Sequence, residues 1–173
     1  MTDSRGLLKN ILSASAVAAA AMALLPGSAM ADERICRGTI DAIVVDGDVR
    51  VADGASCVLK GATVKGNVLV GKNARLSARG AKINGNVQAE NHTNVAVLAN
   101  STVGGSIQLK QGGTARIENV RVNGDVQLFS NKGTQVVKAN RIGGNLQCKS
   151  NQPAPTGSNN VVGGNKEDQC RRL

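Results

Sequence analysis

The sequence predicts an all-β fold: a single-stranded parallel β-helix, or solenoid, of about seven right-handed coils with 19–20 residues each. Three observations predict it. A short glycine-containing motif recurs at nearly constant spacing, apolar and polar residues alternate within each unit, and aromatic residues are almost absent. Phe129 is the only aromatic residue among 173. Because large rings usually fill the centre of a compact globule, their absence favours a narrow, repetitive core.

Residues 1–31 have the pattern of a cleaved secretory signal peptide. Arg5 and Lys9 make the N-terminal region positively charged, and residues 11–25 form an apolar run. Ala29 and Ala31 give the small-x-small pattern of a signal-peptidase site. The run is shorter than the ~20 residues of a membrane-spanning helix. We therefore expect a mature chain, residues 32–173, without a transmembrane segment. It forms one β-helix domain that is secreted or periplasmic.

A glycine followed by a small polar residue, which we call the marker glycine, recurs once in each unit. The steps between successive marker glycines are 19, 19, 20, 19, 20 and 20 residues, a period typical of solenoids. We expect these glycines to adopt positive φ at a corner of the coil. The Asn, Asp or Ser after each one is expected to tolerate the left-handed conformation and to hydrogen-bond along the stack. The marker glycines are Gly47, Gly66, Gly85, Gly105, Gly124, Gly144 and Gly164.

Apolar residues keep fixed distances from the marker glycine, at two residues before it, two after it and seven before it. Within each unit they alternate with polar residues, which indicates strands, and most are β-branched. A unit that is apolar on one face cannot bury that face alone. Winding the chain into coils places each strand beside its equivalent, ~4.8 Å away. The column seven residues before the marker glycine reads Ile40, Leu59, Ala78, Leu98, Ile117 and Val137.

The four cysteines are expected to form two disulfides, Cys36–Cys57 and Cys148–Cys170. The partners are separated by 21 and 22 residues, close to one coil, and stacked residues one coil apart meet the distance that a disulfide needs. Such bonds would close the first and last coils, where strand edges are unpaired, and favour a capped monomer. Zinc binding is the alternative, but the sequence has no Cys-x-x-Cys pair.

The sequence predicts no catalytic residue, no metal site and no cofactor. His92 is the only histidine, and its polar surroundings predict a solvent-facing side chain. Asp41, Asp46, Asp48 and Asp53 cluster in the first unit, where the preference of Asp for turns explains most of them. Calcium binding is the alternative for this cluster.

The basic residues suggest a binding surface on a chain with a formal net charge of +9. Lys82, Arg121 and Arg141 share the column three residues before the marker glycine, and Lys65 and Arg79 belong to the basic residues of coils two and three. On a rigid solenoid these side chains would form a positive face for an envelope polysaccharide or another polyanion. Nucleic acid is not expected, since stacking aromatic residues are missing. Solubility alone is the alternative explanation of the charge.

The coil length and the motifs GNV, GDV and GGN over residues 38–147 resemble small exported bacterial β-solenoid proteins of unassigned activity. More distantly, the chain resembles the bactofilins, which implies a β-helix whose ends stack into filaments. Bactofilins are cytoplasmic and lack signal peptides and cysteines. Pectate-lyase-like β-helices also have a similar coil length.

Together these features predict a non-enzymatic structural scaffold of the bacterial envelope. A binding module whose basic face holds an anionic glycan or lipid headgroup is the second hypothesis. The third is a small polysaccharide-active enzyme.

Overall fold

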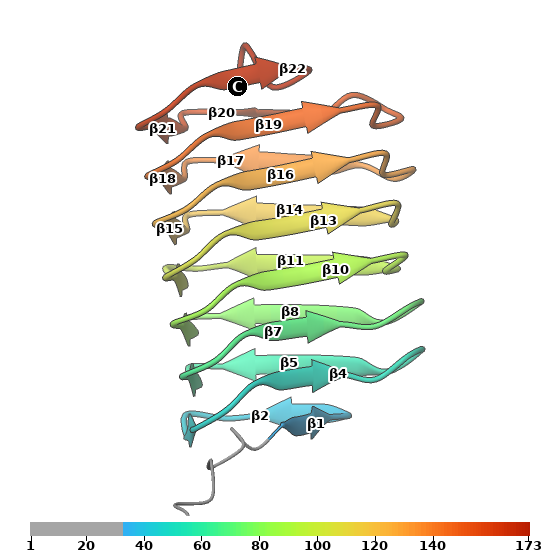
Figure 1. The fold of residues 1–173 in the computed structure, drawn as a ribbon, viewed down its shortest axis with the longest axis vertical. Helices are drawn as coiled ribbons and strands as arrows, with labels where there is room; N and C mark the ends of the chain where they lie inside the picture. Colours follow the sequence, from blue (N-terminus) through green and yellow to red (C-terminus); the bar gives the residue numbers. More distant parts are fainter. Residues whose placement is uncertain (1–32) are drawn as a thin grey trace, which may run out of the picture.

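A computed structural model describes residues 33–173, so the predicted signal peptide lies outside the described residues. The described chain is a parallel β-helix of about seven turns and contains no helix, which confirms the predicted fold class (Figure 1). In Figure 1 the strands at the front run to the right and those behind run to the left as the chain rises. The winding is therefore right-handed.

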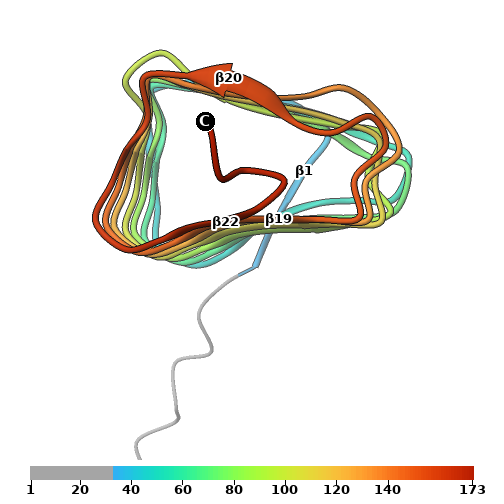
Figure 2. The same ribbon diagram turned by 90° about the horizontal axis from the view of Figure 1, so that it is seen from above.

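Each coil contributes one strand to each of three parallel sheets, where it pairs with its equivalents in the adjacent coils. Sheets A and B form the two long walls of the cross-section, and sheet C forms a short wall (Figure 2). Sheet A consists of β1 (Arg34–Cys36), β4 (Val49–Val51), β7 (Val68–Val70), β10 (Val87–Glu90), β13 (Ile107–Lys110), β16 (Val126–Phe129), β19 (Leu146–Lys149) and β22 (Lys166–Asp168). Sheet B consists of β2 (Gly38–Ile40), β5 (Ser56–Lys60), β8 (Arg75–Arg79), β11 (Asn94–Leu98), β14 (Thr114–Glu118), β17 (Gln135–Lys138) and β20 (Thr156–Ser158). Sheet C consists of β3 (Val44–Val45), β6 (Thr63–Val64), β9 (Lys82–Ile83), β12 (Thr102–Val103), β15 (Arg121–Val122), β18 (Arg141–Ile142) and β21 (Val161–Val162).

The interior is a thin stack of aliphatic side chains, as the alternating pattern predicted. Successive strands in register place like residues over one another, so each column of the sequence becomes a ladder inside the solenoid. Burial of these ladders is the main favourable contribution to folding. The column two residues after the marker glycine is fully buried at Val49, Val68, Val87, Ile107, Val126 and Leu146.

One residue of the predicted interior columns is misplaced, because Leu98 does not point into the solenoid. β11 puts Val97 in the interior column instead, and Leu98 stacks between Arg79 and Glu118. The corner after β11 contains one residue more than the equivalent corner after β8, and counting back from the glycine could not detect this. Leu98 is still only 6% exposed.

The marker glycines are not at positive φ, so that prediction was wrong. The left-handed glycines of the corners are others, among them Gly54 and Gly80. The marker glycines are needed because adjacent coils approach closely: a Cβ on Gly85 would lie 2.7 Å from the carbonyl oxygen of Gly66. Close backbone approach is a general reason for glycine within a sheet.

The polar residue after each marker glycine is not left-handed either, but it hydrogen-bonds along the stack as predicted. The backbone N–H of Asn67 donates to Oδ1 of Asp48 (2.6 Å), and that of Asn86 donates to Oδ1 of Asn67 (2.9 Å). The same contact repeats up to the backbone N–H of Asn165. This side-chain ladder satisfies backbone donors that the sheet hydrogen bonds do not reach.

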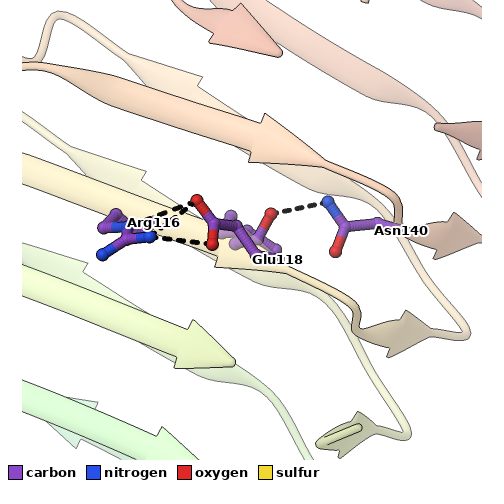
Figure 3. A network of polar contacts seen from close by, with 4 residues as sticks. Arg116, Glu118 and Asn140 are labelled. Carbon is purple, nitrogen blue, oxygen red and sulfur yellow. Dashed lines mark hydrogen bonds and ion pairs between the residues drawn. The ribbon is translucent and has the colours of Figure 1, made fainter. Parts of the chain in front are cut away.

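Buried asparagines line two corners of the C-terminal half, which the sequence pattern did not predict. Nδ2 of Asn140 donates to the carbonyl oxygen of Ile117 (2.7 Å) and to Oδ1 of Asn160 (3.0 Å). Figure 3 shows the contact with Ile117 beside the ion pair that Arg116 and Glu118 form on the outer face. Buried polar groups need such partners to be tolerated. The four asparagines are Asn131, Asn140, Asn151 and Asn160.

Two disulfides close the end coils, with the predicted pairing. The Cα atoms are 5.6 Å apart in Cys36–Cys57 and 5.3 Å apart in Cys148–Cys170. After β22 the chain turns across the opening of the solenoid, where Cys170 is buried (Figure 2). Closing a loop of this size contributes roughly 3 kcal/mol. Disulfides of this kind are typical of chains in non-reducing, extracytoplasmic compartments.

Candidate functional site

Lys82, Arg121 and Arg141 lie in one column on the outer face of sheet C, and we call them the basic strip. The register pairs Lys82 with Thr102, Thr102 with Arg121, and Arg121 with Arg141. Each strand of sheet C has two residues, and the second one points into the core at all three basic positions. The first residue must therefore point to solvent, since side chains alternate along a strand.

The cations of the basic strip have no acidic partner in the described chain. The ion pairs among residues 33–173 are Arg50–Glu33, Lys65–Asp46 and Arg116–Glu118. Each guanidinium or ammonium group of the strip therefore faces solvent with its charge uncompensated by an ion pair. Exposed cations held on a rigid sheet produce a local positive potential that attracts anions.

Lys65 and Arg79, the two other residues predicted for the positive face, do not join the strip. The ammonium group of Lys65 lies 2.6 Å from Oδ1 of Asp46, so its charge already has a partner. Arg79 ends β8 in sheet B, where it stacks beside Lys60. The five predicted residues thus form one ordered column of three, with two residues outside it.

A shallow furrow runs beside the basic strip, and we call it the axial furrow. It consists of two hollows that share Arg121 and Asn123 as lining residues. Since the hollows meet there and follow successive coils, the furrow runs parallel to the solenoid axis. Its remaining lining residues are mainly Lys82, Asn84, Thr102, Gly104, Arg141, Gly143, Val161 and Gly163.

The floor of the furrow is formed by the residue that precedes each marker glycine. A side chain is missing at Gly104 and Gly143, and a Cβ on Gly104 would overlap the backbone carbonyl of Asn84 in the preceding coil. Asn84 and Asn123 are exposed and line the furrow. These amides are thus available to a ligand, since an amide can both donate and accept.

Sequence reasoning missed this furrow, although a signal for it exists. The residue before the marker glycine reads Asn84, Gly104, Asn123, Gly143 and Gly163 in successive units. An alternation of amide and glycine in a solvent-facing column predicts polar groups separated by open space. The pattern acquires that meaning only when the column is known to lie beside the cations.

His92 is buried, so the predicted solvent-facing position was wrong. His92 is only 3% exposed, and neither ring nitrogen has a hydrogen-bond partner among the described residues. Burial lowers the pKa of the His92 imidazole to about 4, because the charged form loses its hydration. The ring occupies the corner between β10 and β11, where Gly112 of the next coil leaves space for it. It therefore takes no part in the furrow on sheet C.

Two aspartates of the first coil each accept a separate backbone hydrogen bond. Asp48 accepts the backbone N–H of Asn67, and Asp53 accepts that of Lys72 (2.9 Å). Within residues 33–173, no three His, Cys, Asp or Glu residues are grouped closely enough to hold a metal ion.

Comparisons with known protein families, with curated proteins and with solved structures find no match. Among residues 33–173, no helix is long and apolar enough to span a membrane. The geometry of sheet C is thus the feature that distinguishes between the candidate functions.

Proposed function

We propose that this protein is a non-enzymatic scaffold that is secreted or periplasmic and holds an anionic polymer of the envelope on its basic strip. One observation carries this proposal. Lys82, Arg121 and Arg141 are in register, exposed and without acidic partners among the described residues, and they border a furrow that offers free amides.

The rigidity of the fold supports a scaffold role. Interior strands pair on both sides, and disulfides close the first and last coils. Cations mounted on such a frame keep their spacing when a ligand binds, so little conformational entropy is lost. We further propose that the ends closed in this way keep the protein a monomer.

The lining of the furrow favours holding a polymer over cleaving it. Hydrolysis of a glycosidic bond generally uses a pair of carboxyl groups that flank the bond. Asp, Glu and His do not occur among the described residues that line the axial furrow. Incubating the protein with an acidic polysaccharide and counting new reducing ends tests this point, and we expect none above background.

The proposed compartment rests on two independent features. The first 31 residues have the composition of a secretory signal, and both disulfides need a non-reducing environment. Fractionation of cells that express the full-length chain would place it, and recovery in the cytoplasmic fraction with free thiols would contradict the proposal.

Removing the charges of the basic strip should abolish most of the binding. For the variant Lys82→Gln/Arg121→Gln/Arg141→Gln we expect affinity for immobilised polygalacturonate to fall about 100-fold at low salt, from about 1 kcal/mol for each exposed cation that faces an anionic surface. Affinity of the unmodified protein should also fall as salt rises, because exposed charges are screened. Retention measured across a salt series reports both effects.

A matched control separates the strip from net charge. Arg75→Gln/Lys110→Gln/Lys149→Gln removes the same number of exposed cations from sheets A and B. We expect this control to retain most of the affinity. Equal losses in both variants would show that binding depends on net charge alone, and the strip would then have no specific role.

A further inference from the structure

We propose that the ligand of the axial furrow is a linear acidic polysaccharide that lies parallel to the solenoid axis, with about one sugar residue for each coil. This inference rests on the proposed function and specifies the chemistry and the direction of the ligand. The alternative anionic partner, a lipid surface, is treated below as an outcome of the test.

The shape of the furrow indicates the direction. Its two hollows meet at Arg121 and Asn123 and together extend from the coil of Lys82 to that of Gly163. Across the axis, it is bordered by strands of only two residues. A flexible chain fits a long and narrow furrow, whereas a planar membrane surface would meet cations spread over a broad face.

The spacing of the cations indicates the repeat of the ligand. Successive coils are ~4.8 Å apart, and a pyranose residue in an extended chain advances by about the same length. A uronate polymer carries one carboxylate on each residue. Its carboxylates would therefore meet Lys82, Arg121 and Arg141 in turn, while Thr102 faces the residue between the first two.

The floor of the furrow suits the remaining groups of a sugar. The exposed amides of Asn84 and Asn123 line the furrow and can bind hydroxyl groups. Between and beyond them, Gly104 and Gly143 line the hollows without a side chain, so a pyranose ring can approach their backbone. A polymer that carried charge but no hydroxyl groups would leave these amides unused.

Both ends of the footprint are marked by residues that do not favour an anion. On the N-terminal side, Lys65 is already paired with Asp46, whose carboxylate repels a polyanion. On the C-terminal side, the column continues with Val161, which is uncharged and 59% exposed. The binding footprint therefore covers the four coils from Lys82 to Arg141, and a tetrasaccharide fills it.

The test uses galacturonate oligomers of two, three, four and six residues, with affinities measured by calorimetry at low salt. Affinity should rise about 5-fold from the dimer to the tetramer, because the tetramer also reaches the third cation, Lys82. It should then change little for the hexamer. Two single variants locate the oligomer: Lys82→Gln should weaken the tetramer and leave the dimer almost unchanged, whereas Arg141→Gln should weaken both.

Each contrary result has a distinct meaning. If the dimer and the tetramer bind equally, or if Lys82→Gln weakens both to the same extent, the axial placement is overturned while the proposed function stands. If oligomers and long polygalacturonate fail to bind but vesicles with anionic lipid bind through the basic strip, the polysaccharide proposal is overturned. If neither probe binds through the strip, the proposed function itself fails.

Discussion

Replacing Gly85 with alanine is expected to lower the free energy of unfolding by about 4 kcal/mol, near the upper end for a single substitution. The new Cβ would lie 2.7 Å from the carbonyl oxygen of Gly66. The two coils would have to separate there, which weakens the hydrogen bonds from the backbone N–H of Gly85 to Gly66 (3.0 Å) and of Asn86 to Asn67 (2.9 Å). Urea denaturation followed by circular dichroism measures the loss.

Gly54→Asn is the matched control for this prediction. Gly54 has φ +69, a Cβ added there would meet no atom within 4 Å, and Asn73, stacked in the next coil, already has φ 57. Because Asn tolerates this conformation, the control should cost no more than about 1 kcal/mol. Comparable losses at the two positions would contradict the close-approach explanation of the marker glycines.

Lowering the pH from 7 to 4 should remove about 3 kcal/mol of stability through His92 alone, given 1.36 kcal/mol for each pKa unit. The folded protein holds the imidazole pKa at about 4, below its ordinary value of 6.5. The unfolded chain therefore takes up a proton more readily between these values. The contribution of His92 is complete above pH 6.5 and is lost as the pH falls through 4. Denaturation midpoints across this range measure it.

Carboxylates also titrate near the lower limit of this range, so the His92→Asn variant provides the reference. Asn131 occupies the same corner two coils further on, and its Nδ2 donates to the carbonyl oxygen of Leu109 (3.1 Å). The amide introduced by His92→Asn would face the equivalent carbonyl of Val70. We expect this variant to lose markedly less stability between pH 7 and 4. An identical pH dependence in both proteins would show that His92 is not the group responsible.

Most of the fold was predictable because equivalent residues make the same stacking contacts in every coil of a solenoid. A single period gave the strands, the interior columns and the pairing of Cys36 with Cys57, since each depends only on which residues stack. The misplaced Leu98 shows the limit of this reasoning. The extra corner residue lengthens the step from Gly85 to Gly105 to 20 residues, but the step alone does not show which corner of the coil holds it.

The remaining errors concern backbone contacts and side-chain burial, which the aligned columns of the repeat do not reveal. Glycine is favoured both at a corner with positive φ and where two coils approach closely. The glycine at position 85 could therefore not distinguish these two explanations from the sequence. The exposure of His92 was inferred from its polar neighbours, although the empty space at Gly112 in the next unit is what allows its burial.

The candidate site was predictable in part for the same reason. Lys82, Arg121 and Arg141 share a column, so the period alone placed them together. Lys65 carries the same charge, but only its three-dimensional contact with Asp46 shows that the charge is compensated. The furrow is lined partly by glycines at which adjacent coils approach closely, and residue-by-residue reading does not show which surface they line.

The most direct test of the central claim is to titrate the isotope-labelled protein with the galacturonate tetramer and record the amide NMR shifts. If the axial furrow holds a linear acidic polysaccharide, the changes should be confined to residues 82–84, 102–104, 121–123 and 141–143, which comprise four strands of sheet C and the residue after each. Changes centred on sheet A or sheet B, or changes limited to a single coil, would contradict this account.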